Sequence, residues 1–141
     1  MAGIPFVAPI DPLNYATAER VATRVERVIA RNPNHYTFTG TGTYLIGSPN
    51  SSHGECAVID PGPDVPEHRQ ALEAALVDRR VTAIVVTHCH SDHVGLAAWL
   101  KELTGAPPVA WKPHGAVRLL DNPDDLEVMK QLAPPPKAAA E

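Results

Sequence analysis

Length, composition and charge narrow the classes of protein to which this chain can belong. Its 141 residues suffice for one modest domain, and 44% hydrophobic with 20% charged residues is typical of a globular rather than a disordered protein. The formal net charge is -4, which argues against a protein that binds nucleic acid or an acidic membrane surface through a basic patch.

The start of the chain does not resemble a targeting segment. Residues 1–10 lack a basic stretch followed by an apolar one, and no run approaches the roughly 20 apolar residues that span a bilayer. Two cysteines, Cys56 and Cys89, are too few for a disulfide framework, so we expect reduced thiols. These features predict a cytoplasmic protein without a membrane partner.

The first 60 residues predict a meander of strands. An irregular arm precedes the segment 21–29, whose spacing fits helix or strand but whose β-branched residues favour strand. Further strands are predicted over 43–46 and 55–60. The segment 47–52, rich in Gly, Pro and Ser, separates them as a loop.

From Pro66 onward the pattern alternates between helix and strand. Pro66 suits the first turn of a helix that runs to about Arg79, and the apolar run 81–87 is typical of a strand buried on both faces. A helix over 92–103 and a short strand over 109–111 follow, and another helix could begin at His114. This alternation implies crossover connections and a sheet covered by helices.

A compact group of ligand-type residues follows the predicted buried strand. His88 lies at the strand end, His90 in the turn, and Asp92 and His93 at the start of the next helix, which Asp92 could also cap. The carboxyl ends of strands in an open α/β sheet border the crevice where ligands bind. Imidazole nitrogens with a carboxylate suit Zn²⁺, Fe²⁺ or Mn²⁺ better than Ca²⁺, and the lack of a Cys cluster argues against a structural zinc site.

Three stretches of this sequence together resemble the metallo-β-lactamase fold superfamily. Residues 87–95, Thr-His-Cys-His-Ser-Asp-His-Val-Gly, resemble its metal-binding signature, and residues 57–62, Ala-Val-Ile-Asp-Pro-Gly, resemble its strand that ends in an acidic residue near the metals. Residues 39–47 are similar to the preceding strand in the branch that includes β-lactamase-like protein 2 and the glyoxalase II-like hydrolases. The resemblance covers about residues 20–115.

This resemblance implies an α/β fold, namely the N-terminal half of an αββα sandwich with a mixed sheet and helices on one face. Together with the composition of the two ends, it predicts three parts: residues 1–20 as an N-terminal arm, residues 21–120 as a partial metallo-β-lactamase-like domain, and residues 121–141 as a short helix with a disordered Pro- and Ala-rich tail.

The resemblance also implies a function. His88 and His90 would bind the first of two zinc ions, Asp92 and His93 would bind the second, and Asp92 would act as the catalytic residue that orients the attacking hydroxide. Iron or manganese could replace zinc. A metal-bound hydroxide would then hydrolyse a small-molecule ester, thioester, lactone or phosphodiester.

The ligand set is smaller than the family requires. The family takes a third histidine, a bridging aspartate and a last histidine from its second half, whereas the only histidine after His93 is His114. Four residues for two ions leave two per ion, below the three of typical catalytic zinc sites. We therefore expect the chain alone to bind metal weakly, to be weakly active, and to expose an apolar sheet face that favours self-association or a missing C-terminal half.

Two alternatives stay open at this point. The chain could be a non-catalytic half-domain that pairs with a second chain or with itself. It could also be a mononuclear metal-binding protein that uses His88, His90 and His114, although His114 fits a turn residue better than a ligand.

Other candidate residues receive structural interpretations. Asp60 could hold a ligand histidine in one tautomer or cap the turn before Pro-Gly. We expect Cys56 to lie in the core and Cys89 to be a small, partly buried side chain. Three further histidines are predicted to be solvated: His35, His53 and His68.

Overall fold

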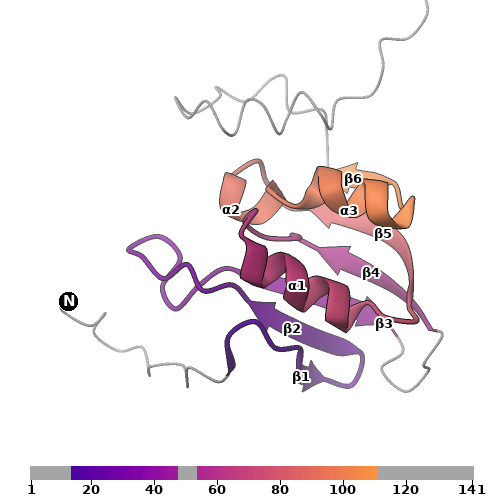
Figure 1. Cartoon of the computed structure of the whole chain (residues 1–141), viewed down its shortest axis with the longest axis horizontal. Helices are drawn as coiled ribbons and strands as arrows, with labels where there is room; N and C mark the ends of the chain where they lie inside the picture. Colours follow the sequence, from indigo (N-terminus) through magenta and orange to yellow (C-terminus); the bar gives the residue numbers. More distant parts are fainter. Residues whose placement is uncertain (1–13, 48–53, 111–141) are drawn as a thin grey trace, which may run out of the picture.

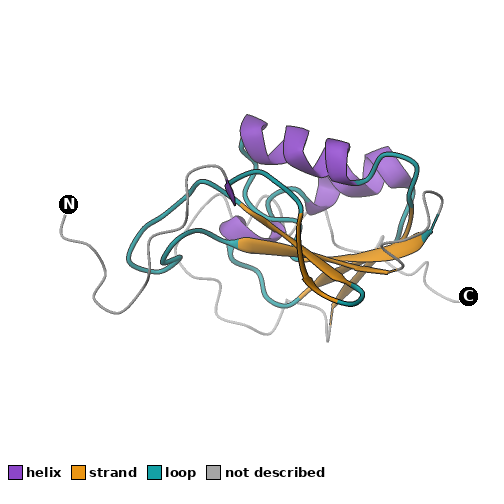
Figure 2. Ribbon diagram, turned by 90° about the horizontal axis from the view of Figure 1, so that it is seen from below, coloured by secondary structure: helices purple, strands orange, loops and turns teal. Residues whose placement is uncertain are grey.

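A computed structural model describes residues 14–47 and 54–110 of the chain. These residues form a six-stranded sheet in which every strand lies beside its neighbour in the chain, with the helices on one face (Figures 1 and 2). The strands are β1 (Glu19–Ala22), β2 (Val25–Ile29), β3 (Gly42–Gly47), β4 (Glu55–Ile59), β5 (Arg80–Val86) and β6 (Pro108–Ala110), and the helices are α1 (Pro66–Ala75), α2 (Ser91–Val94) and α3 (Ala97–Thr104).

The sheet is mixed, as the sequence predicts. Strands β1 to β4 pair antiparallel as a meander, and β5 and β6 are then added in parallel. Parallel neighbours need a crossover, which α1 supplies between β4 and β5, and α2 with α3 supply between β5 and β6. The α/β prediction, with a mixed sheet and helices on one face, is therefore confirmed.

One face of the sheet, called the covered face here, packs against the helices. Leu45, Val58 and Ile84 stand in register on neighbouring strands, and each is at most 1% exposed. Leu76, just beyond α1, and Leu100 from α3 complete this cluster from the helical layer. Because residues alternate between the faces of a strand, the next residue along each strand points away from this core.

The opposite face of the sheet, called the open face here, carries side chains that are also apolar. In the described ranges the helices all lie on the other side (Figure 2). Ile46 and Val109 on this face are 40% and 48% exposed, and the others are half-buried. We define the open face by Tyr44, Ile46, Ile59, Val85 and Val109, whose positions follow from the strand register.

Helix α1 is shorter than predicted. The sequence pattern runs to about Arg79, but the helix ends at Ala75 and Leu76 takes the cap position. Asp78 then adopts a left-handed backbone with φ 59°, which turns the chain toward the start of β5 at Arg80. The turn keeps Leu76 in the core and leaves Val77 exposed.

The single helix predicted over 92–103 is two helices, α2 and α3. The break occurs because the N–H of Leu96 donates to the carbonyl of Gly62, at 3.0 Å, instead of continuing the α2 ladder. The predicted helix from His114, the short helix and tail predicted within residues 121–141, and His53 and His114 themselves lie outside the described residues.

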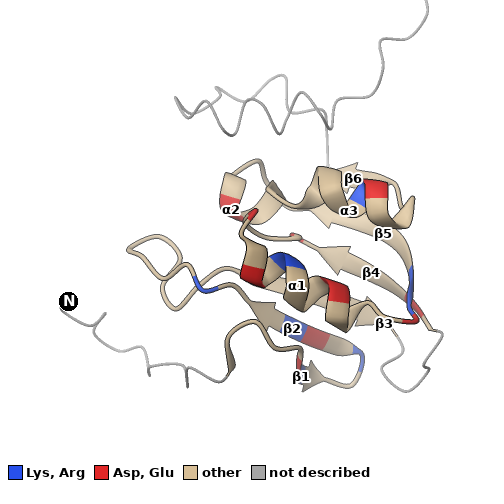
Figure 3. Ribbon diagram, in the orientation of Figure 1, with Lys and Arg blue, Asp and Glu red and all other residues tan. Residues whose placement is uncertain are grey.

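Charged residues of both signs lie on β2 and α1 (Figure 3). Arg27 and Glu19 pair at 3.1 Å on neighbouring strands, and Arg79 after α1 contacts Glu26 of β2. Within residues 14–47 and 54–110, no helix is long and apolar enough to cross a membrane.

Candidate metal centre

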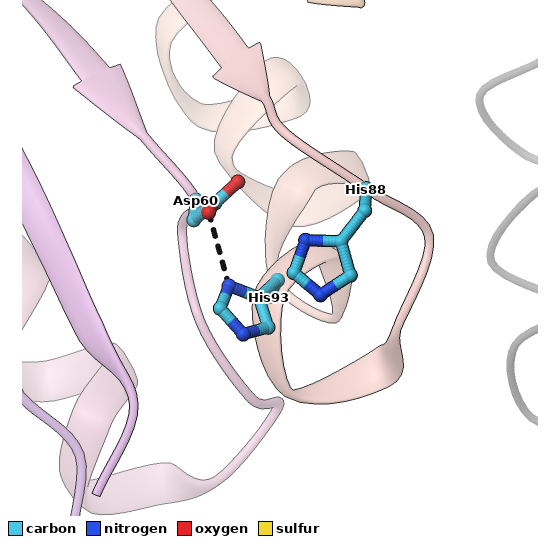
Figure 4. A group of neighbouring side chains, drawn as sticks. All are labelled: Asp60, His88 and His93. Carbon is cyan, nitrogen blue, oxygen red and sulfur yellow. Dashed lines mark hydrogen bonds and ion pairs between the residues drawn. The ribbon is translucent and has the colours of Figure 1, made fainter. Parts of the chain in front are cut away.

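Three potential ligands meet at one edge of the sheet. Asp60 directly follows β4, His88 comes shortly after the end of the parallel neighbour β5, and His93 lies on α2 (Figure 4). One oxygen of Asp60 and one ring nitrogen of each histidine all lie within 4.8 Å of one another. Because parallel strands end at the same edge, the crossover through α1 brings residues 60 and 88 together.

The other two residues predicted as ligands lie beside this group. The ring of His88 lies 4.1 Å from that of His93 and 4.8 Å from that of His90, measured between centroids. Asp92 Oδ2 is 3.3 Å from His93 Nε2. His90 is exposed and stands outside the tight group of three, which instead includes Asp60.

Asp60 is held by three hydrogen bonds in a buried position. Its side chain accepts from the Thr87 N–H at 2.8 Å and from the Thr87 hydroxyl at 2.6 Å. His93 Nδ1 donates to Asp60 Oδ2 across 3.0 Å, as drawn in Figure 4. A proton on Nδ1 leaves Nε2 of His93 as the nitrogen with a free lone pair. Asp60 therefore contacts a candidate ligand histidine, which is one of the two interpretations that the sequence offered for it.

The same threonine orients His88. Because the Thr87 hydroxyl gives its only proton to Asp60, it accepts from the Nδ1–H of His88, at 2.8 Å. This arrangement again leaves Nε2 unprotonated. Burial first, and then the neighbouring His93 and His90, lower the pKa of His88, which favours the neutral imidazole that can bind a metal.

Asp92 is placed differently from the sequence-based expectation. The prediction that it caps the helix is wrong, because α2 begins at Ser91 and His90 occupies the N-cap position. The carboxylate of Asp92 instead accepts a 2.8 Å hydrogen bond from Thr41, which directly precedes β3. This contact joins residues 51 positions apart and lies beyond any local sequence signal.

The prediction that His68 is solvated is wrong. His68 is only 1% exposed, and its Nε2 lies 2.9 Å from the Thr43 hydroxyl and 3.1 Å from the Pro61 carbonyl. Burial lowers the pKa of His68 to about 4, so the ring is neutral. The missed signal is the four-residue spacing to Leu72, which places both on the inner side of α1.

The remaining histidine and cysteine predictions can be compared directly. His35 is exposed, as expected for a solvated loop residue. Cys56 is 3% exposed in the core, and burial raises the pKa of its thiol. Cys89 is half-buried, in agreement with the small, partly buried side chain that the sequence suggests.

Gly62 joins the two loops that carry the candidate ligands. Its N–H donates to the His93 carbonyl at 2.9 Å, and its own carbonyl accepts from Leu96. The backbone of Gly62 has φ 92°, and a Cβ there would lie 2.4 Å from the Nε2 of His68. A side chain at this position would therefore be strained and would also collide with α1.

The donor set suits a divalent transition metal. Two imidazoles with free Nε2 atoms stand near the carboxylates of Asp60 and Asp92, which is the chemistry that zinc, iron and manganese prefer. His93 Nε2 and Asp92 Oδ2 lie 3.3 Å apart, and in the tautomer with the proton on Nδ1 both atoms carry lone pairs. A cation between or beside them would relieve their repulsion, so the residues fit a metal.

Similarity to known proteins agrees with this geometry. The sequence model of the Metallo-beta-lactamase superfamily matches residues 36–139, more than half of the chain. The chain belongs to the metallo-β-lactamase superfamily. A beta-lactamase domain protein from Burkholderia ambifaria has the same fold over 76% of this chain and 32% of its own, with a TM-score of 0.54 and 23% identity.

Relatives of this chain include members of the predicted branch of the superfamily. The Beta-lactamase-like protein 2 homolog of Caenorhabditis elegans is 33% identical over 65% of this chain and 29% of its own length. An atrochrysone carboxyl ACP thioesterase of Cryptosporiopsis sp. is 32% identical over 62% of this chain and 26% of its own. A hydroxyacylglutathione hydrolase of Pseudomonas aeruginosa is 57% identical over 36% of this chain and 19% of its own. The chain thus spans less than a third of these relatives.

Proposed function

We propose that this chain supplies the N-terminal part of a metal-dependent hydrolase that acts on a small-molecule acyl thioester. The observation that carries the proposal is the group of Asp60, His88 and His93, whose ligand atoms lie within 4.8 Å at one sheet edge. Relatives named as a thioesterase and a hydroxyacylglutathione hydrolase favour a thioester over the ester, lactone and phosphodiester alternatives.

We assign the metal ligands by combining the motif with this geometry. In the proposal His88 and His90 bind one zinc ion and Asp92 and His93 bind a second, while Asp60 fixes the tautomer of His93. Iron or manganese would suit the same donors. When bound, the metal supplies Lewis acidity that activates water and polarises the scissile carbonyl.

The chain's own residues then orient the reaction. Asp92 accepts a hydrogen bond from Thr41 on Oδ2, and in the proposal its second oxygen, Oδ1, would accept one from the attacking water. In this role Asp92 is the catalytic residue that orients the water and takes its proton. Two ligands per ion are fewer than the three of typical catalytic zinc sites, so further ligands would come from outside the described residues.

Metal binding by the purified 141-residue chain tests this proposal. In equilibrium dialysis against excess zinc, which also detects weak binding, we expect bound zinc in the wild-type chain and loss of most of it in His88→Ala. The exposed loop residue His35 provides a matched control, since His35→Ala removes a histidine that is not in the ligand group and should leave the zinc content unchanged. Equal zinc contents in all three proteins would contradict the proposal.

Hydrolysis and stoichiometry complete the test. We expect slow turnover of an acyl-glutathione thioester that disappears in Asp92→Asn while the protein remains folded by circular dichroism. One tightly bound ion whose affinity depends on Asp60 and not on His90 would instead indicate a mononuclear site made of Asp60, His88 and His93.

A further inference from the structure

A pair of polar residues outside the metal-binding motif connects the β2–β3 loop to Asp92. Asn32 lies three residues beyond the end of β2, and Thr41 directly precedes β3. The Asn32 Oδ1 accepts from the Thr41 N–H at 2.9 Å, and the Asn32 Nδ2 donates to the Thr41 hydroxyl at 3.1 Å. The oxygen and the nitrogen of the Asn32 side-chain amide therefore both form hydrogen bonds with Thr41.

These bonds determine the direction in which the Thr41 hydroxyl donates. An amide NH₂ can only donate, so the Thr41 Oγ1 must use a lone pair toward Asn32. Its one proton is left for Asp92 Oδ2, at 2.8 Å. Thr41 is 4% exposed, so water has little access with which to replace either bond. A hydrogen bond to an ionised acceptor in such surroundings is among the stronger kinds.

We propose that Asn32 and Thr41 are positioning residues that hold the Asp92 carboxylate in its orientation for metal and water. The inference rests on the proposed function, in which Asp92 binds the second ion. By donating to Oδ2, the oxygen that lies 3.3 Å from His93 Nε2, Thr41 restrains rotation of the carboxylate about its Cβ–Cγ bond and keeps that oxygen beside the candidate ligand. Asn32 acts through Thr41, because its hydrogen bond to Oγ1 keeps the hydroxyl from rotating its proton away from Asp92.

The loop does not depend on this hydroxyl for its closure. The backbone N–H of Ala30 donates to the Thr41 carbonyl at 2.9 Å, and the N–H of Asn32 donates to the Ala30 carbonyl at 2.9 Å. Thr37 adds a further side-chain bond, from its hydroxyl to the Asn32 carbonyl at 2.5 Å. Removal of the Thr41 hydroxyl should therefore loosen Asp92 while the loop stays in place.

Metal affinity of the full chain measures this effect. We expect Thr41→Val, which removes the hydroxyl and keeps the shape, to weaken zinc binding about 10-fold in a competition titration with a chromophoric chelator, within the range typical of residues that orient a ligand. Thr41→Ser should restore affinity to within about twofold, and Asn32→Ala should cause a smaller loss than Thr41→Val. Thr37→Val is the matched control, because its hydroxyl bonds only backbone atoms of the same loop.

A double-mutant cycle separates positioning from a general structural role. With Asp92→Asn as the background, Thr41→Val should cause little further loss of zinc affinity, because the carboxylate it orients is gone. The proposal is overturned if Thr41→Val binds zinc as tightly as the wild type, if Thr37→Val weakens binding as much, or if the two losses simply add.

A metal-free measurement distinguishes this proposal from the proposed function. The carboxyl ¹³C resonance of Asp92, assigned by its absence in Asp92→Asn, should shift in metal-free Thr41→Val and return in Thr41→Ser. If the wild type binds no zinc, the proposed function fails, and this resonance still decides whether Thr41 holds Asp92. An unchanged resonance in Thr41→Val overturns the positioning role.

Discussion

On the covered face of the sheet Leu45, Val58 and Ile84 are at most 1% exposed, whereas Ile46 and Val109 on the open face are 40% and 48% exposed. Both sets are aliphatic, and β5 is apolar throughout except for Arg80 and Thr82. Strands with apolar residues on both sides are typical of sheets that are covered on both sides. The strand sequence thus reports which faces are suited to burial, while the structure shows which face is buried within the described residues.

Matched truncations on the two faces test this difference, and they have the largest expected effect. Ile84→Ala on the covered face should lower the free energy of unfolding by about 3 kcal/mol, because it leaves a cavity in a closely packed core. Ile59→Ala removes the same atoms from the half-buried open face and should cost about 1 kcal/mol or less. Urea denaturation measures both, and equal losses would mean that the open face is as well packed as the other.

Acid should lower the stability of the fold through His68, which is buried on the covered side of the sheet. Burial lowers the pKa of His68 to about 4, although Glu67 and the bond to the Pro61 carbonyl partly offset this. Above the unfolded value of about 6.5 the ring is neutral in both states and its contribution is full. As the pH falls from about 6.5 to 4, His68 becomes protonated in the unfolded chain but stays neutral in the folded chain. The free energy of unfolding therefore declines by up to roughly 3 kcal/mol.

His68→Gln provides the control for this acid effect. The glutamine keeps a polar side chain under the Asp60 loop but does not titrate. Denaturation curves measured between pH 7 and 4 should therefore be flatter for this variant than for the wild type. A wild-type slope that persists in His68→Gln would assign the effect to other groups.

The smallest expected change in stability comes from a charge on the open face. Ile46→Lys should alter the free energy of unfolding by about 0.5 kcal/mol or less, since the side chain is already 40% exposed. It should nevertheless reduce concentration-dependent self-association in sedimentation, because it interrupts an apolar patch. Val77→Lys, at a residue 65% exposed just beyond α1, is the control and should leave association unchanged.

Local patterns predict much of the fold because strand and helix periods are local. The β-branched segment 21–29 contains β2 and part of β1, and the apolar run 81–87 matches β5 to within one residue. The break between α2 and α3 could not be predicted in this way. Its cause is the bond from Leu96 to Gly62, and a partner so far away in the sequence has no signature in the helical pattern.

The candidate site likewise combines features that local sequence predicts with contacts that it does not. His88, His90, Asp92 and His93 are close in sequence, so their grouping is visible from the order of residues alone. Two contacts that orient them are not local, because His93 meets Asp60 33 residues away and Asp92 meets Thr41 51 residues away. The sequence offered contact with a ligand histidine as one of two interpretations of Asp60, and it gave no indication of Thr41, which belongs to no motif.

The two-way bonding of Gly62 has a consequence for protein engineering. Because this glycine donates to His93 and accepts from Leu96, two backbone hydrogen bonds through one residue join the loops 60–64 and 87–96. A chimera that imports either loop alone from a relative would have to reproduce that connection with a mismatched partner. The two loops should therefore be exchanged together, as one cassette, when the specificity of such a scaffold is redesigned.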